Sequence, residues 1–168
     1  MELFIDKINS AMGTILLVSD GNCLCALDYA GYENRMMKLL WRHYPRFQLR
    51  PTIDPQGFSS QIRAYLAGDI DCINGIPVST GGTVFQQRVW SALRAIPPGT
   101  VLTYGELAAK LGKPTAYRAV GMTNALNPIA IVVPCHRLVG ANGALTGYAG
   151  GLERKQWLLQ HEGVTLPH

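Results

Sequence analysis

The stretch "IVVPCHRLVG", residues 131–140, places a thiol beside an imidazole where an apolar run ends. Cys135 becomes a nucleophile if a base takes its proton, and His136 could be that base. The apolar residues predict a buried strand that ends near Pro134. Because neighbours on a strand point to opposite faces, direct pairing of the two side chains needs a turn or a bridging water. An inert buried cysteine beside a surface histidine is the alternative reading.

A histidine that acts as a base commonly needs a carboxylate to orient its ring. Glu106, Glu153 and Glu162 are the candidates in this half of the chain. Glu162 lies near the C-terminal end of a predicted helix at 151–163, where the helix dipole disfavours a negative charge. Such a carboxylate either is solvated at a frayed helix end or has a cationic partner, and the sequence leaves both open.

The other three cysteines do not form a metal-binding pattern. Cys23 and Cys25 are separated by one residue, and no histidine nearby has zinc-ligand spacing. We expect no metal site. We also expect Cys23, Cys25 and Cys72 to be reduced, buried and unreactive, because the chain shows no secretion signal.

The composition predicts a globular protein. Of the 168 residues, 48% are apolar and 15% are charged, which suits one compact unit or two small lobes. No run approaches the roughly 18 apolar residues of a membrane span. No basic-then-apolar leader opens the chain, so we expect a cytoplasmic location.

Charge is unevenly distributed along the chain. Residues 1–79 contain seven Lys and Arg against eight Asp and Glu, whereas residues 80–168 contain eight against three. The basic second half hints at a polyanionic partner. This signal is weak by itself, because many basic domains bind nothing acidic.

The first half has the pattern of an α+β domain. "GN" at 21–22 is a turn signal between two apolar runs and predicts a hairpin. Ser59 or Ser60 could cap the second helix. The segment "NGIPVSTGG" at 74–82 has several helix and strand breakers, so we place a boundary there and expect domains 1–78 and 79–168. The expected strands are 3–8, 13–19, 24–28 and 47–50, and the expected helices are 32–44 and 59–68.

The second half is predicted to be mostly helical. Thr83 can cap a helix that ends at Pro97, and helices at 104–112 and 115–126 joined by a short turn predict a helix-turn-helix. The second of these helices is rich in small residues, with Arg118 as its one long cationic arm. Close helix packing would also explain the small residues, since major-groove readers usually carry Arg, Asn or Gln there.

Several segments in order resemble one known family, the O6-alkylguanine-DNA alkyltransferases of the bacterial stand-alone type. They are "GGTVFQQRVWSALRAIPPGTV", "TYGELAAKLGKP", "YRAVG", "NPIAIVVPCHRLVG" and "GYAGGLERKQWLLQHEG", and together they cover about residues 80–163. The resemblance implies an α+β fold. Its N-terminal lobe would hold a small antiparallel sheet with helices (ribonuclease-H-like). Its C-terminal lobe would be mostly helical, with a helix-turn-helix of the winged-helix type.

The resemblance also implies a reaction. Cys135 would take the alkyl group from O6-alkylguanine, and from O4-alkylthymine, in a stoichiometric and irreversible transfer. His136 would remove the thiol proton through a water, and Glu162 would orient the imidazole. Tyr104 would donate a hydrogen bond to the guanine ring, and Asn127 would tie together the backbone of the turn.

Double-stranded DNA containing the lesion is the implied partner, bound in the minor groove with the damaged nucleotide flipped out. Arg118 would fill the vacated position. The resemblance implies no cofactor, no metal, no membrane and a monomer; whether copies cluster on DNA stays open. Ala149 stands where some relatives have serine. The implied DNA contacts further include Thr115, Ala116, Ala119 and Gly121, and the implied substrate pocket consists of Val133, Pro134, Gly147, Tyr148, Ala149, Gly150 and Lys155.

Three other functions compete with this one. A lesion sensor would lack the acceptor cysteine, which this chain has. A Cys-His-Glu hydrolase would turn over repeatedly, and it leaves Arg118 on its small-residue helix unexplained. A DNA-binding regulator would need base-reading side chains and a dimerisation element, and the sequence shows neither.

Overall fold

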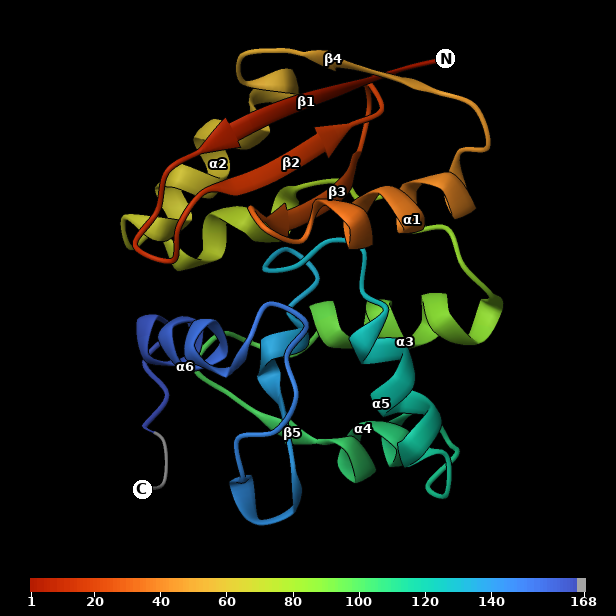
Figure 1. The fold of residues 1–168 in the computed structure, drawn as a ribbon. Coiled ribbons are helices and arrows are strands. Elements are labelled where there is room, and N and C mark those ends of the chain that lie inside the picture. Colours follow the sequence, from red (N-terminus) through yellow and green to blue (C-terminus); the bar gives the residue numbers. More distant parts are fainter. Residues whose placement is uncertain (166–168) are drawn as a thin grey trace. The chain divides into compact units, whose positions relative to one another are not determined.

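The computed structural model describes residues 1–165 and divides the chain into two compact units (Figure 1). The first unit contains Met1–Gly82 and Pro128–Val132, and the second contains Thr83–Asn127 and the chain from Val133 onward. The α+β class is confirmed. The contact-based division lies after Gly82, and residues 128–132 belong to the first unit, which the sequence did not predict. Within 1–165, no helix combines the length and the apolar character that a membrane span requires.

A four-stranded sheet forms the centre of the first unit. Its strands are β1 (Glu2–Ile8), β2 (Ile15–Ser19), β3 (Leu24–Tyr29) and β4 (Gln48–Pro51), in the order β3-β2-β1-β4. The expected antiparallel sheet is wrong in one respect, because β4 pairs with β1 in parallel and the sheet is mixed. Helix α1 (Glu33–His43) is the reason. It carries the chain from β3 to the far edge of the sheet, and such a crossover makes the next strand parallel to β3.

Helix α1 packs against the sheet through its apolar face. Met36 and Leu40 join a buried cluster with side chains from β1, β2 and β3. Helix α2 (Phe58–Leu66) buries Phe58, Ile62 and Tyr65. The predicted serine cap of α2 is wrong, since Gly57 is the N-cap residue and the Ser59 hydroxyl instead donates a hydrogen bond to Asp6. Two 3-10 helices, Pro55–Gly57 and Ile70–Gly75, flank α2.

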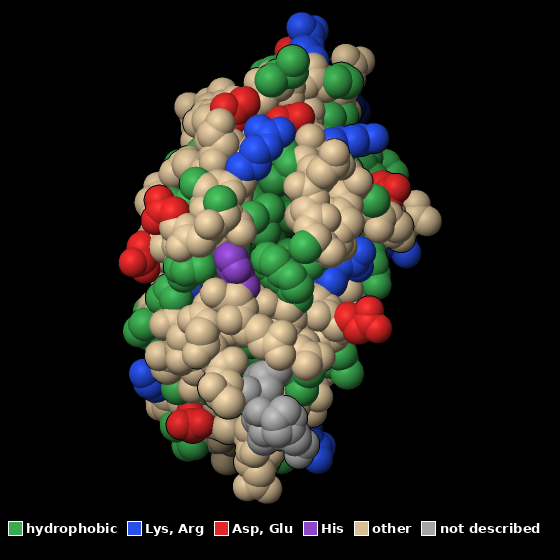
Figure 2. Space-filling model, turned by 90° about the vertical axis from the view of Figure 1, so that its left-hand side faces the viewer, with side chains coloured by type: hydrophobic (Ala, Val, Ile, Leu, Met, Phe, Trp, Pro, Cys, Tyr) green, Lys and Arg blue, Asp and Glu red, His purple; other side chains and the backbone are tan. Residues whose placement is uncertain are grey.

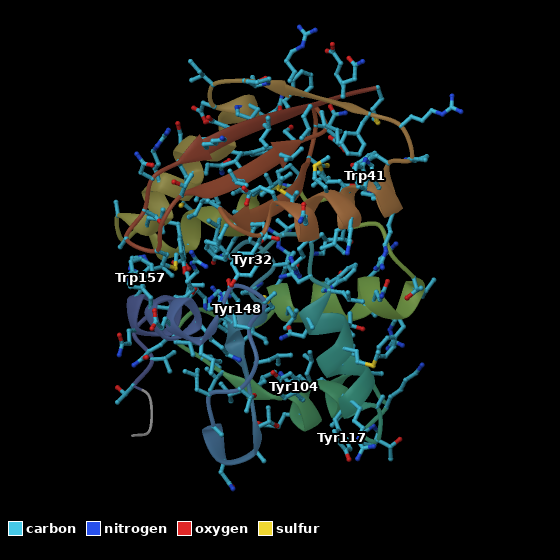
Figure 3. All side chains as sticks on the ribbon, in the orientation of Figure 1. Tyr32, Trp41, Tyr104, Tyr117, Tyr148 and Trp157 are labelled. Carbon is cyan, nitrogen blue, oxygen red and sulfur yellow. The ribbon has the colours of Figure 1, made fainter. Side chains whose placement is uncertain are left out.

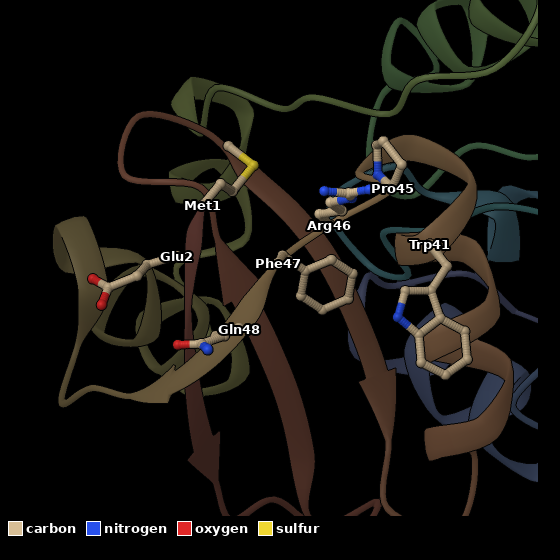
Figure 4. Close-up of a pocket in the computed structure, with 7 residues that line it drawn as sticks. All are labelled: Met1, Glu2, Trp41, Pro45, Arg46, Phe47 and Gln48. Atoms are coloured by element: carbon tan, nitrogen blue, oxygen red, sulfur yellow. The ribbon is translucent and has the colours of Figure 1, made fainter.

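An open pocket of about 600 Å³ lies on the first unit. Trp41 from α1 and Phe47 before β4 line it, together with Arg46 and Glu2 (Figure 4). Trp41 is 56% exposed. None of the residues predicted to do chemistry lines this pocket.

Four helices build most of the second unit. They are α3 (Val84–Arg94), α4 (Tyr104–Lys110), α5 (Tyr117–Ala125) and α6 (Leu152–His161). The predicted Thr83 cap is confirmed, since its side chain accepts from Gln86 N and Gln86 accepts from Thr83 N. Buried Trp90 of α3 donates to the Thr123 carbonyl of α5 at 3.2 Å. The helix α4, the segment 111–116 and α5 therefore form a helix-turn-helix that rests on α3.

A two-stranded parallel ladder completes the second unit. Strand β5 (Leu102–Thr103) pairs with β6 (Leu138–Val139), and two 3-10 helices, Cys135–Arg137 and Ala141–Gly143, lie on either side of β6. Side chains of both charges are scattered over the face of the molecule drawn in Figure 2.

The buried strand expected before Cys135 is wrong, because the chain turns twice there. The Val132 amide bonds to the Ala130 carbonyl at 2.8 Å around Ile131, whose φ of +71° is rare for a β-branched residue. The Cys135 amide bonds to the Val133 carbonyl at 2.8 Å around Pro134. Both are γ-turns. A continuous apolar run indicates burial, and it does not distinguish a strand from a buried turn.

Candidate active site

The β5–β6 ladder brings two distant parts of the sequence together. Cys135 and His136 lie on the 3-10 helix directly before β6, and Tyr104 follows β5 directly as the first residue of α4. The pairing of Leu102 with Leu138 therefore places Tyr104 near Cys135. A capping box fixes the start of α4, since Thr103 accepts from Glu106 N and Glu106 accepts from Thr103 N.

His136 belongs to a buried cluster of charged and polar groups. Its Nε2 lies 2.9 Å from Oε2 of Glu162, the C-cap residue of α6. Arg137 donates two hydrogen bonds to the same carboxylate at 2.8 and 2.9 Å, and a third to the Ile96 carbonyl at 2.7 Å. The side chains of His136 and Glu162 are fully buried and that of Arg137 is 2% exposed. The carboxylate is thus balanced by the guanidinium, and the imidazole is oriented by the carboxylate.

The environment sets the protonation of this cluster. Burial tends to raise the pKa of Glu162, but the hydrogen bonds and charges of His136 and Arg137 outweigh it and hold the pKa well below its usual value. Burial lowers the pKa of His136 in spite of the opposing carboxylate. The resting histidine is therefore neutral, and its Nδ1 has no hydrogen-bond partner within the described chain. A neutral imidazole with a free ring nitrogen can accept a proton.

Two asparagine amides hold the backbone around Cys135. Asn127, just after α5, donates from Nδ2 to the Val133 carbonyl at 2.7 Å. Asn124 donates from Nδ2 to the Cys135 carbonyl at 3.3 Å. Both side chains are buried, and both bonds tie the end of α5 to the turn that carries the thiol.

Cys135 lines a cavity of about 280 Å³. Figure 3 labels two of the rings that line it, Tyr104 at the start of α4 and Tyr148 on the segment that leads into α6. The aromatic rings, the thiol and the nearby backbone give it the mixed apolar and polar character of a small-ligand site. The lining residues are Tyr104, Gly121, Asn124, Ala125, Cys135, Gly147, Tyr148 and Ala149.

Lys155 of α6 supports one wall of this cavity. Its ammonium donates to the Thr146 carbonyl and, at 3.1 Å, to the Gly147 carbonyl. Burial lowers the pKa of Lys155 to about 8, and the Cys135 sulfur acts in the opposite direction. The interaction is mutual, so a protonated Lys155 favours the thiolate of Cys135. Val133, Pro134 and Gly150 are buried beside the cavity lining without belonging to it.

All four cysteines are free thiols, and residues 1–165 contain no group of three or more side chains that could hold a metal ion.

Comparison with known proteins assigns this chain to a family. A family model described as "6-O-methylguanine DNA methyltransferase, DNA binding domain" matches residues 84–164. A Salmonella typhimurium protein named methylated-DNA–protein-cysteine methyltransferase is 48% identical, and a Shigella flexneri protein of the same name is 46% identical, each over 99% of both chains. The chain belongs to the methylated-DNA–protein-cysteine methyltransferase family.

Solved structures agree with this family. A crystal structure of Mycobacterium tuberculosis OGT in complex with DNA is 39% identical, with a TM-score of 0.77 over 95% of this chain and 92% of that one. An O6-methylguanine-DNA methyltransferase from Pyrococcus kodakaraensis has a TM-score of 0.66 at 26% identity, over 96% of this chain and 99% of that one.

The predicted DNA-contact residues of this methyltransferase lie on or just before α5. Thr115, Arg118 and Ala119 are exposed, whereas Ala116 and Gly121 are half-buried. Gly121 also lines the cavity, and a Cβ there would lie 3.7 Å from the Tyr104 ring. The face of α5 that carries Arg118 is thus exposed.

The structure distinguishes among the three candidate carboxylates. Glu106 is used in the capping box of α4, and Glu153 is exposed in the first turn of α6. Only Glu162 of the three contacts the imidazole. The sequence reading missed Arg137 and Asn124. Arg137 could have been found, because an arginine within the apolar run 131–139 needs a buried anionic partner; Asn124 carried no such signal.

Proposed function

We propose that this methyltransferase repairs DNA by moving the alkyl group of O6-alkylguanine onto the sulfur of Cys135. One observation carries the proposal: Cys135 lines a cavity and adjoins a buried, neutral histidine that a carboxylate orients. A cavity gives the lesion a place beside the thiol, and the histidine gives the thiol proton a destination.

The transfer begins with proton removal. His136 takes the thiol proton through a bridging water, and Glu162 stabilises the resulting imidazolium at 2.9 Å. The thiolate then attacks the alkyl carbon in line with the C–O6 bond. The new S–C bond forms as the C–O6 bond breaks, and the electron pair of the broken bond stays on guanine. Guanine regains one proton and leaves neutral, so the net change is one thiol proton exchanged for one alkyl group.

Charges around the thiol support this order of events. The resting cluster contains one Arg137 cation and one Glu162 anion, and proton transfer adds an imidazolium and a thiolate. The net charge of the buried site therefore stays constant. Protonated Lys155 further favours the thiolate. Tyr104 donates a hydrogen bond to the guanine ring, and the 147–151 segment with Tyr148 and Ala149 holds the alkyl group.

Binding to DNA uses the helix-turn-helix in the minor groove. A stacked base cannot reach a thiol that is 3% exposed, so the damaged nucleotide must rotate out of the duplex. Arg118 fills the space that it leaves, while Thr115, Ala116, Ala119 and Gly121 let α5 approach the groove. Binding weakens as salt rises, because Lys and Arg contacts release counterions from phosphates.

The proposed transfer happens once per molecule and needs no cofactor. A thioether is a poor leaving group, so Cys135 does not regain its thiol. We further propose that the protein acts as a monomer in the cytoplasm and also accepts O4-alkylthymine, less readily.

Intact-protein mass spectrometry tests the proposal. After mixing with duplex DNA that contains O6-methylguanine, the protein should gain about 14 Da, the mass of a methyl group replacing a proton. Cys135→Ser should gain nothing. Repeated release of product by protein of unchanged mass would instead favour a hydrolase, and tight binding with neither outcome would favour a lesion sensor.

A further inference from the structure

Two large apolar side chains on α5 are exposed to solvent. Tyr117, the first residue of the helix, is 47% exposed, and Met122 is 71% exposed. The other exposed residues of this helix are Arg118, Ala119 and Ala125. Core packing does not account for the Tyr117 ring, and the function proposed above gives it no role.

The Tyr117 ring contacts the guanidinium of Arg118. Cζ of Arg118 lies 5.9 Å from the ring centroid, within the range of a cation–π interaction. Successive residues on a helix are rotated by about 100° and do not face each other, so the Arg118 side chain bends back over the ring. Among residues 1–165, its guanidinium forms no hydrogen bond and no ion pair. The ring is therefore the group that orients it.

Tyr117 lies on the face of α5 that leads to the cavity. Gly121 follows it by four positions, and Asn124 and Ala125 follow by seven and eight, so the four residues share one face of the helix. The last three line the cavity that contains the reactive thiol. Figure 3 labels Tyr117 at the start of α5. The ring thus adjoins Arg118 and stands one helical turn before the cavity lining.

We propose that Tyr117 positions Arg118 for entry into the duplex, and that its ring stays against the guanidinium in the place that the damaged nucleotide leaves. This inference rests on the proposed function. A cation–π contact is stronger when the pair is removed from water, as it is within a DNA groove. The contact therefore stabilises the extruded state of the DNA more than it stabilises the free protein. It also leaves the arginine side chain fewer conformations to lose on entry.

Duplex and single-stranded substrates separate this role from the transfer step. A lesion in a single strand leaves no gap in a base-pair stack for an arginine to fill. Single-turnover transfer rates are measured at saturating protein on O6-methylguanine in each context. Tyr117→Leu keeps an apolar side chain without the ring, so it should slow transfer in the duplex about two- to fivefold and leave the single-strand rate unchanged. Tyr117→Phe keeps the ring and should retain the wild-type rate in both.

Replacing both residues tests whether the ring acts through the arginine. In an Arg118→Ala background, Tyr117→Leu should cause no further loss of duplex rate. A further loss of the same size would show that the ring acts on DNA by itself, which overturns the inference. Faster duplex transfer by Tyr117→Leu would also overturn it, because the ring would then hold Arg118 away from the duplex.

Phe85→Leu is the matched control. Nζ of Lys113 lies 5.5 Å from the centroid of the Phe85 ring, and neither residue of this second cation–π pair lines the cavity. Its ratio of duplex to single-strand rates should equal that of the wild type. Tyr117 has only a structural role, and the inference is overturned, if Tyr117→Leu slows both substrates equally or if Phe85→Leu lowers the ratio by the same factor. Absence of transfer from either substrate by the wild type would instead overturn the proposed function.

Discussion

The two units contain buried thiols that differ in chemistry despite similar exposure. Cys25 on β3 of the first unit is 2% exposed and Cys135 of the second is 3% exposed, and both are free. Burial and the charge of Asp20 raise the pKa of Cys25 to about 12, and its sulfur donates to the Val18 carbonyl at 3.3 Å. Cys135 instead lines a cavity beside His136 and Lys155.

This contrast shows that burial alone does not determine what a cysteine can do. An anion nearby and close packing make Cys25 a small apolar side chain. A neutral base, a lysine and an open cavity suit Cys135 to nucleophilic attack. The identity of the neighbouring groups, and access to the sulfur, distinguish the two.

The largest expected effect comes from replacing each thiol in turn. Cys135→Ser should abolish alkyl transfer, a loss of about a thousandfold or more, because the serine hydroxyl is a much weaker nucleophile. Cys25→Ser should leave the transfer rate per folded molecule unchanged. Rapid-quench measurements on DNA containing O6-methylguanine compare the two variants. Equal losses in both would remove the contrast.

Each unit also has a carboxylate–arginine pair, and the pairs differ in burial. Glu162 with Arg137 is almost fully buried, whereas Arg35, the partner of Asp28, is 23% exposed. Glu162→Gln leaves a buried guanidinium without its counter-charge and should lower the free energy of unfolding by about 3–5 kcal/mol. Asp28→Asn should cost about 1–2 kcal/mol. Urea unfolding of both variants measures the difference, and a larger loss in Asp28→Asn would contradict it.

Mild acid should destabilise the protein through His136 of the second unit. The pKa of His136 is lowered on folding, so below pH 6.5 this imidazole is protonated more readily in the unfolded chain than in the folded chain. The contribution of His136 to stability is fully present above its ordinary pKa of 6.5 and is lost as pH drops below it, by up to about 1.4 kcal/mol per pH unit. The lowered pKa of Glu162 adds a further loss below 4.5.

The variant His136→Gln isolates the histidine part of this pH dependence. Its unfolding free energy should change less than that of the wild type between pH 6.5 and 5, as measured by urea titration at each pH. Parallel curves for the two proteins would assign the acid sensitivity to other groups.

The smallest expected effect concerns the helix that carries Tyr104. Thr103→Ala removes the cap of α4 and should cost about 1 kcal/mol of stability. Thr83→Ala removes the same kind of cap from α3 and should cost a similar amount. Only Thr103→Ala should also slow transfer, by a fewfold, because Tyr104 follows Thr103 directly. Equal transfer rates in the two variants would show that the cap does not position Tyr104.

The spacing of apolar residues in the sequence predicted the helices and strands whose formation depends on that spacing. Alternating and helical spacing of apolar residues located β1–β3, α1 and α3 within a few residues. The direction of β4 was not predictable, because a strand has the same residue pattern in parallel and antiparallel pairing. The Cys135–His136 pair was visible as adjacent residues, and Glu162 was visible as a charge at an unfavourable helix end.

The sequence did not reveal contacts between residues that lie far apart in the chain. Asn124 and Cys135 are eleven positions apart, and only the fold brings the amide to the thiol's carbonyl. The γ-turn at Ile131 puts a β-branched residue at positive φ, which local preference disfavours. Tertiary packing overrode the local pattern at this point.

The segment Pro128–Val132 belongs to the first unit, and this limits how the protein can be cut into fragments. Two backbone hydrogen bonds join this segment to Leu27 of β3. The Leu27 amide donates to the Pro128 carbonyl, and the Ala130 amide donates to the Leu27 carbonyl, each at 3.1 Å. A fragment that begins at Thr83 would keep these five apolar residues but lack β3, the strand to which they are hydrogen-bonded. Such a fragment should expose apolar surface and self-associate. Studies of the DNA-binding half in isolation would therefore do better to supply the N-terminal half as a second polypeptide.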